Sequence, residues 1–194
     1  ATSDATGSEL QIVDATAPTV DVLVTTDTTP IVTGTAPFPL GGGEQLDVTI
    51  NGVTYSDVTV TAAGTWAVLV SPALSDNTYD VDAVITKNSS PVAGGADVTS
   101  QELIIDTMDP TAPTVVPETT NAIYPVVTGT ATILAGETLT VSINGGTYEN
   151  VAVDGLGNWS IDTSVAPESG TVGAFVNTNT YTATATVTDG AGNS

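Results

Sequence analysis

The chain is 194 residues long and carries one Lys or Arg against 22 Asp and Glu, which gives a formal net charge of −21. Nucleic acid and anionic membrane surfaces need clustered cations, so this charge excludes both as partners, and no apolar run is long enough to predict membrane insertion. The sequence contains no Cys and no His, which excludes disulfides and thiol chemistry and removes the commonest general base and metal ligand. Carboxylates and carbonyls remain as ligands, and these suit a hard cation such as Ca²⁺.

The first predicted element is a strand in SELQIV, residues 8–13, which has no earlier strand to pair with. Alternating Val, Thr and Ile residues then predict further strands, and the Asn51-Gly52 pair supplies the positive φ angles of a tight hairpin between two of them. Strands are expected near residues 18–24, 30–36, 46–51, 53–60, 65–71, 78–87 and 99–106.

The second half of the chain repeats the first. PTVDVLVTTDTTPIVTGTA matches PTVVPETTNAIYPVVTGTA, and GTWAVLV matches GNWSIDT. Pro18 and Pro113 are 95 residues apart, and Trp66 and Trp159 are 93 apart. A period of this length without helical periodicity predicts an all-β fold of two tandem seven-stranded immunoglobulin-like β-sandwiches, the second lacking its last strand within this chain.

The strand at the start of the chain matches the one that the second sandwich lacks. Lys87 to Asp106 spans 19 residues, and joining the end of the chain to its start gives the same 19 residues from Asp189 to Asp14. We therefore assign residues 1–13 to the last strand of a preceding or neighbouring repeat, 14–106 to the first sandwich, and 107–194 to the second, completed by a strand equivalent to 8–13.

The expected partners are thus neighbouring identical repeats. The parent chain could continue covalently through many such repeats, or separate subunits could exchange the N-terminal strand by strand addition. The predicted strand-exchange interface consists of Leu10, Ile12 and Val13.

Four aromatic residues recur at matching positions. Trp66 and Trp159 could stack a sugar, but their alternation with apolar neighbours favours a place in the core. Tyr79 and Tyr181 resemble a tyrosine corner, which is a structural feature.

Acidic residues are expected to gather at one joint between the sandwiches, because strand parity brings alternate loops to the same end. Close carboxylates repel one another, and Ca²⁺, which takes six to eight oxygens, is the natural neutraliser. The alternative is a solvated acidic rim. The candidate metal ligands are Asp106, Asp109, Asp154, Asn158, Asp189 and Asn193, with Asp27 and Asp76 on the facing side.

The first repeat differs at these positions. Lys87, the only cation of the chain, replaces the acid that matches Asp189 and is a possible cation substitute that pairs with Asp14. There are two alternatives for Lys87: it could form an isopeptide cross-link with an Asn, or it could simply be exposed. The two joints are therefore expected to differ in calcium dependence.

Enzyme motifs are absent from the sequence, and we predict no enzyme. There is no P-loop and no Gly-x-Ser-x-Gly elbow. Asp80 and Asp82 could suggest glycosidase chemistry, but two acids on one strand are more simply a solvated sheet face.

Several motifs together resemble the bacterial immunoglobulin-like repeats of giant secreted adhesins, including the biofilm-associated and RTX types. They are T-x-P-x-V-T-G-T-A, the Asn-Gly hairpin, G-x-W, N-T-Y-x-x-x-A, T-D-G-A-G-N and the closing I-D or V-D before T-A-P-T. The resemblance implies an extracellular, cell-surface extender that holds an adhesive tip away from the cell and is stiffened by Ca²⁺ at its junctions. The family's junction acids would map onto Asp106, Asp109 and Asp189.

The function expected from this resemblance is a structural extender repeat for adhesion or biofilm. The alternative is a subunit of a self-assembling extracellular filament, joined by donor-strand complementation through residues 8–13. A sugar- or ice-binding module is a third alternative.

Overall fold

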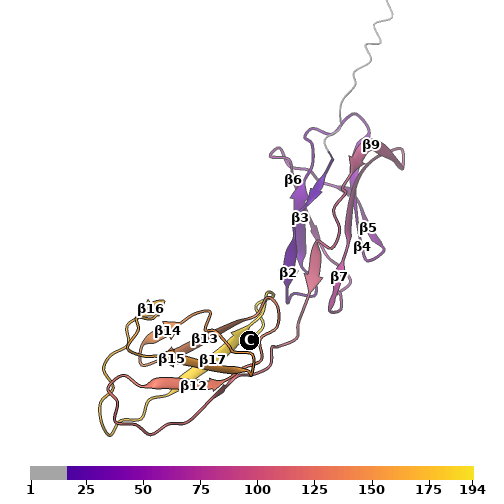
Figure 1. Ribbon diagram of the computed structural model, residues 1–194. Helices are drawn as coiled ribbons and strands as arrows, with labels where there is room; N and C mark the ends of the chain where they lie inside the picture. The colour runs from indigo at the N-terminus through magenta and orange to yellow at the C-terminus, as the bar shows by residue number, and fades with distance from the viewer. Residues whose placement is uncertain (1–16) are drawn as a thin grey trace, which may run out of the picture. The chain divides into compact units, whose positions relative to one another are not determined.

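The computed structural model describes residues 17–194 (Figure 1). These residues form 17 strands and no helix, so the all-β prediction is confirmed. They divide into two compact units. Unit 1 contains residues 17–23 and Asp27–Ile105, and unit 2 contains Val24–Thr26 and Asp106–Ser194. The division cuts strand β2 (Leu23–Thr25), which is described below with the sheet of unit 1 to which it is hydrogen-bonded. The predicted strand at 8–13 and Asp14 lie outside the described residues.

Unit 1 is built from three sheets around one core. The first sheet has the order β1 (Thr19–Val20), β3 (Ile31–Thr35), β6 (Thr65–Leu69). The second has the order β5 (Val53–Val58), β4 (Glu44–Ile50), β8 (Val81–Lys87), β9 (Ser90–Ala96). The third has the order β2 (Leu23–Thr25), β10 (Leu103–Ile105), β7 (Asn77–Tyr79).

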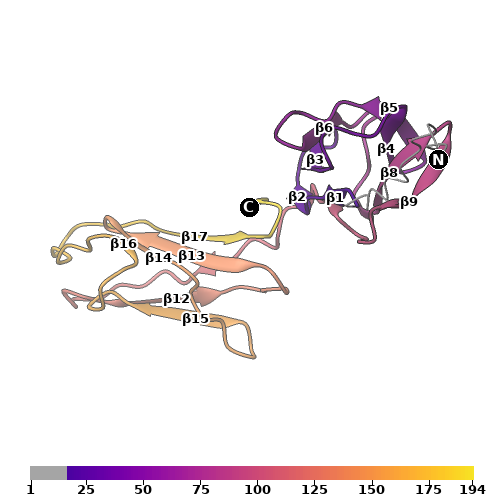
Figure 2. The same cartoon turned by 90° about the horizontal axis from the view of Figure 1, so that it is seen from above.

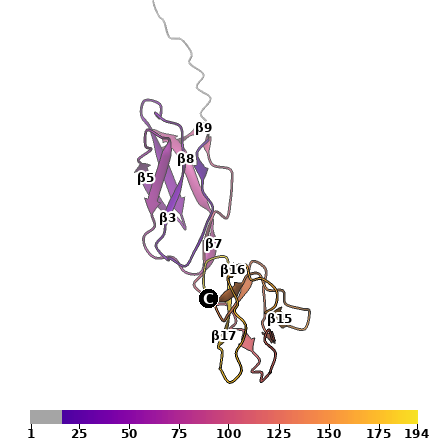
Figure 3. The ribbon, with the colours of Figure 1, turned by 90° about the vertical axis from the view of Figure 1, so that its left-hand side faces the viewer.

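Three strands of unit 1 differ from the sequence prediction. The strand expected at 78–87 is divided at Asp80 into β7, which pairs with β10, and β8, which pairs with β4 and β9 (Figure 3). The strand expected at 18–24 is likewise divided between two sheets, as β1 and β2. The segment SSPVAGGAD, which lies between the strands expected at 78–87 and 99–106, forms β9 (Ser90–Ala96), because Asn88 and Ser89 have φ angles of 49° and 61° and close a tight hairpin.

Unit 2 has two sheets, which Figure 2 shows as separate layers. One has the order β11 (Thr114–Val115), β12 (Val126–Thr130), β15 (Asn158–Asp162). The other has the order β16 (Ser169–Gly170), β14 (Gly146–Tyr148), β13 (Thr138–Ile143), β17 (Ala183–Thr188). The Asn-Gly hairpins form in both units, since Asn51 and Asn144 have φ angles of 48° and 49°.

The tryptophans belong to the two cores, as their alternation predicts. Trp66 and Trp159 are each 2% exposed, and each side chain lies over a glycine of the neighbouring strand, Gly34 or Gly129. A Cβ at Gly34 would overlap the Trp66 indole and the carbonyl oxygen of Thr19. This close approach of indole and backbone explains why the motif V-T-G-T-A occurs in both halves of the sequence.

The tyrosines also have structural roles. The Tyr79 hydroxyl donates to the carbonyl oxygen of Ser75, four residues upstream, at 2.9 Å, in the manner of a tyrosine corner. The Tyr181 hydroxyl instead accepts from the backbone N–H of Val176 at 3.0 Å, and the Tyr181 ring packs edge-on against Phe175.

Candidate functional site

The predicted metal ligands of unit 2 lie largely in two short loops of the same construction. In the first, Asp154–Asn158, the backbone N–H of Asp154 donates to the carbonyl oxygen of Asn158 at 2.8 Å. Asp154 Oδ1 accepts from the backbone N–H groups of Leu156 and Asn158 at 2.8 and 2.9 Å. The side-chain amide of Asn158 also donates to the Asp154 carboxylate. Gly157 takes the φ of 86° that the turn requires.

The second loop, residues 189–193, repeats this pattern. Asp189 Oδ1 accepts from the backbone N–H groups of Ala191 and Asn193 at 2.8 and 2.9 Å, and Oδ2 accepts from Asn193 Nδ2 at 2.8 Å. Asn193 is buried, and its Nδ2 also donates to the carbonyl oxygen of Asp106 at 2.9 Å. The side chain of Asn193 therefore attaches this loop to the segment that begins unit 2.

These hydrogen bonds favour the ionised carboxylates. The backbone N–H of Asn158 is the largest influence on Asp154, and with its side chain it lowers the pKa of that carboxyl below the ordinary value. The side-chain amide of Asn193 has the same effect on the pKa of Asp189. Both carboxylates already face several N–H donors from their own loops.

Unit 1 builds the matching loop without any charge. In Thr61–Thr65 the backbone N–H of Thr61 donates to the carbonyl oxygen of Thr65 at 2.9 Å, and the two hydroxyls are 2.8 Å apart. The backbone N–H of Gly64 donates to the Thr61 carbonyl oxygen, as Gly157 does to Asp154. A Thr pair thus takes the place of an Asp–Asn pair in closing the same loop.

The carboxylates of unit 2 accept N–H groups of their own loops. Within residues 17–194, no three acidic side chains gather in a group that could hold a metal ion. The structure brings Asp106, Asp189 and Asn193 together, because Asn193 Nδ2 donates to the carbonyl oxygen of Asp106 and to Asp189 Oδ2. In this arrangement the asparagine presents N–H groups rather than its oxygen to the two aspartates. The Asp154 carboxylate accepts from Leu156 and Asn158, so these hydrogen bonds lie within one loop.

The remaining candidate ligands are on the surface. Asp109 is exposed in the segment before β11, and Asp76 is exposed before β7. Asp27 is exposed and accepts from the backbone N–H and hydroxyl of Thr29 at 2.8 and 3.2 Å. Lys87 is exposed at the end of β8 opposite Glu44, and its predicted partner Asp14 lies outside the described residues.

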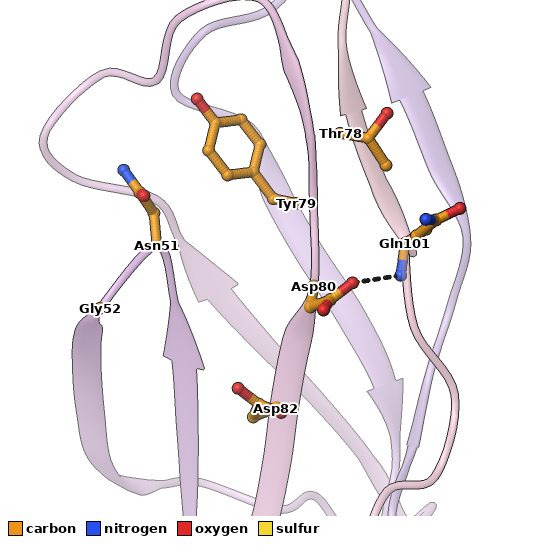
Figure 4. Close-up of a pocket in the computed structure, with 7 residues that line it drawn as sticks. All are labelled: Asn51, Gly52, Thr78, Tyr79, Asp80, Asp82 and Gln101. Atoms are coloured by element: carbon orange, nitrogen blue, oxygen red, sulfur yellow. Dashed lines mark hydrogen bonds between the residues drawn. The ribbon is translucent and has the colours of Figure 1, made fainter.

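A shallow polar pocket of about 440 Å³ lies in unit 1 around Asp80 and Asp82 (Figure 4). Asp80 Oδ1 accepts from the backbone N–H of Gln101 at 2.8 Å, which holds Gln101 at a φ of 68° before β10 begins. The structural work of Asp80 is therefore to fix the turn beside the break between β7 and β8. The sequence interpretation missed this role, because Gln101 is 21 residues away.

A larger groove of about 530 Å³ lies in unit 2. Two segments form its walls, residues 115–125 and 175–183, and the backbone N–H of Phe175 donates to the carbonyl oxygen of Ile123 at 3.0 Å to join them. Apolar side chains lie along it, namely Val115, Val127, Ile143, Phe175 and Ala183. The sequence analysis predicted that this unit lacks its last strand within the chain.

No protein-family model matches the chain, and no curated protein matches it. Within residues 17–194 no helix is long and apolar enough to cross a membrane.

Proposed function

We propose that the chain is a non-catalytic structural repeat, an extender of a large extracellular adhesin or surface fibre, with immunoglobulin-like sandwiches as its units. The observation that carries the proposal is the duplicated framework. Each unit places a Trp over a glycine of the neighbouring strand, uses an Asn-Gly hairpin, and closes a five-residue loop before the Trp strand. Repetition of a whole folding unit adds length, which is what a spacer needs.

The chemistry of the side chains supports a structural role. The sequence has no His, no Cys and one cation, so the usual nucleophile, base and phosphate-binding groups are missing. A sugar-binding role is disfavoured because both tryptophans are 2% exposed and have no free face on which a sugar could stack.

Calcium stiffening stays a prediction. In its favour are 22 acidic residues against one cation, since carboxylates without cationic neighbours attract a divalent ion. Against it stand the loops of Asp154 and Asp189, whose oxygens already accept N–H groups of their own backbone. Calcium binding at either aspartate would bring the ion close to the side-chain amide that now donates to its carboxylate.

Force spectroscopy on the chain held by its two ends tests the proposal. A spacer made of two folded units should unfold in two separate events. Unit 2 is about 90 residues long, so its unfolding should release on the order of 300 Å of chain at about 3.5 Å per residue. A chain that extends smoothly without such events, or that turns over a substrate, would contradict an extender role.

A further inference from the structure

The groove of unit 2 lies where unit 1 carries its last strand. In unit 1, β10 pairs with β7, so that Leu103 lies opposite Tyr79 and Ile105 opposite Asn77. Leu103 and Ile105 are each 1% exposed. The strand β2 flanks β10 on its other side.

The segments that correspond to β2 and β7 form the walls of the groove. The repeat aligns Leu23–Thr25 with residues 118–120 and Asn77–Tyr79 with residues 179–181, and both of these segments line the groove. A similar hydrogen bond supports both units, since Leu74 N donates to Thr28 O in unit 1 and Phe175 N, one residue before the position aligned with Leu74, donates to Ile123 O in unit 2. Within residues 17–194, no strand pairs with 179–181.

Burial differs between the two units at this place. Tyr79, Val81 and Ala83 are 8%, 1% and 0% exposed in unit 1. Their counterparts Tyr181, Ala183 and Ala185 are only half-buried. One step further along the same strand the units agree again, since Ile85 and its counterpart Val187 are 1% and 2% exposed. The uncovered surface is therefore confined to the part of the sheet nearest to where β10 lies in unit 1.

The sequence contains a second copy of the β10 pattern. Glu-Leu-x-Ile occurs twice in the chain, at residues 102–105 and at residues 9–12. The buried positions of β10, Leu103 and Ile105, correspond to Leu10 and Ile12, and the half-buried Ile104 corresponds to the polar Gln11. This alternation is what a strand with one covered face requires.

The glutamate of the pattern has a specific partner in unit 1. Glu102 is 1% exposed, and its Oε2 accepts from the backbone N–H of Val81 at 3.1 Å. Ala183 is the counterpart of Val81, so its backbone N–H is the matching donor for Glu9. A pattern that keeps a Glu beside two apolar residues fits this place better than an apolar peptide would.

We propose that residues 9–12 of a second copy of this chain insert into the groove of unit 2 as a β-strand, antiparallel to residues 179–181. Leu10 then lies opposite Tyr181, Ile12 opposite Asn179, and Glu9 accepts from the backbone N–H of Ala183. In unit 1 the residue after β10 leads directly into the next unit, and by the same connection the residues after Ile12 lead into unit 1 of the copy that donates the strand. The proposal deepens the proposed function, on which it rests for its purpose, by naming how successive copies are joined.

The test is sedimentation of the full 194-residue chain over a range of concentrations, in high salt to screen the acidic surfaces. We expect association that grows with concentration. Leu10→Asp should weaken it at least about tenfold, because the substitution removes a buried apolar side chain and places a charge on the covered face of the strand. Gln11→Asp is the matched control, since it adds the same charge on the opposite face of the strand and should leave association within about twofold.

A free peptide of residues 7–14, GSELQIVD, should compete with association, and amide exchange at 179–183 should slow when copies associate. Three results would overturn the proposal: a monomer at every concentration, equal effects of the two substitutions, or protection of 179–183 that does not depend on concentration. The last would mean that the chain's own N-terminal segment fills the groove. Two unfolding events under force would survive any of these results, so the proposed function is tested separately.

Discussion

Replacing Gly129 with Ala should destabilise unit 2 severely. A Cβ at this position would lie 2.5 Å from Cε2 of Trp159 and would overlap the carbonyl oxygen of Thr114. Neither neighbour gives way easily, since one is backbone paired with β12 and the other belongs to an indole that is 2% exposed. Overpacking of a core costs about 1–3 kcal/mol, and two rigid neighbours place this case at the upper end, about 3 kcal/mol. A domain of this size loses about 4–8 °C of melting temperature for each kcal/mol.

The assay is urea and thermal unfolding of the whole chain, in which the melting transition of unit 2 should move down by roughly 12–24 °C. Gly155→Ala is the matched control in the same unit, because nothing lies within 4 Å of an added Cβ there. The control should change the free energy of unfolding by less than about 0.5 kcal/mol. If Gly129→Ala proved as mild as the control, the explanation of the V-T-G-T-A motif by Trp packing would be wrong.

Three further predictions concern the loops of unit 2. If calcium binds there, the melting temperature should rise in a calcium titration. Asp189→Ala should weaken that rise, and Lys87→Ala, the control in unit 1, should not. An unchanged melting temperature would exclude the metal. Asn193→Ala removes the donor to the carbonyl oxygen of Asp106 and should cost about 1 kcal/mol of unfolding free energy in urea titrations, whereas an unchanged midpoint would mean that this bond adds nothing. The double substitution Asp154→Thr and Asn158→Thr copies the loop of unit 1. Because folding lowers the pKa of Asp154, the stability that this carboxylate contributes is present above the ordinary carboxyl pKa and is lost as pH falls through the folded pKa. In urea titrations at a series of pH values, the free energy of unfolding of unit 2 should therefore fall less steeply in acid for the double variant.

The repeat and the alternation of apolar residues were sufficient to predict the all-β class, the Asn-Gly hairpins and the buried tryptophans. The divided strand at Asp80 was not predictable from periodicity, because β7 and β8 keep the same alternation while they pair with different sheets. The strand β9 was missed because Pro91, Gly94 and Gly95 are typical of loops, and only the positive φ angles of the preceding turn reveal the hairpin.

The acidic loops show that one spacing of residues is compatible with two roles. An aspartate followed four residues later by an asparagine was interpreted as two metal ligands, and the same spacing also lets the carboxylate accept the N–H groups of its own loop. The aligned loop of the first half has Thr61 and Thr65 at these positions and closes without a charge. Comparison of the two halves could have found the loop-closing role.

Several aspartates of the chain have the same structural role, which is to accept a backbone hydrogen bond within a turn. Five aspartates each accept from the backbone N–H two residues further on, which is the arrangement of an Asx-turn: Asp27, Asp106, Asp154, Asp162 and Asp189. With one cation in the sequence, ion pairs cannot balance these charges, so the folded chain repels itself.

Screening should therefore stabilise the protein even where no ion binds at a specific place. The Debye length falls from about 30 Å at 0.01 M salt to about 3 Å at 1 M, so the melting temperature should rise steadily with NaCl. Titrations with NaCl and CaCl₂ at matched ionic strength separate this effect from calcium binding. Coincident curves would mean that the aspartates act only as turn residues with a shared electrostatic cost, and a calcium curve that rises first, at micromolar to millimolar concentration, would mean that some of them also bind the ion.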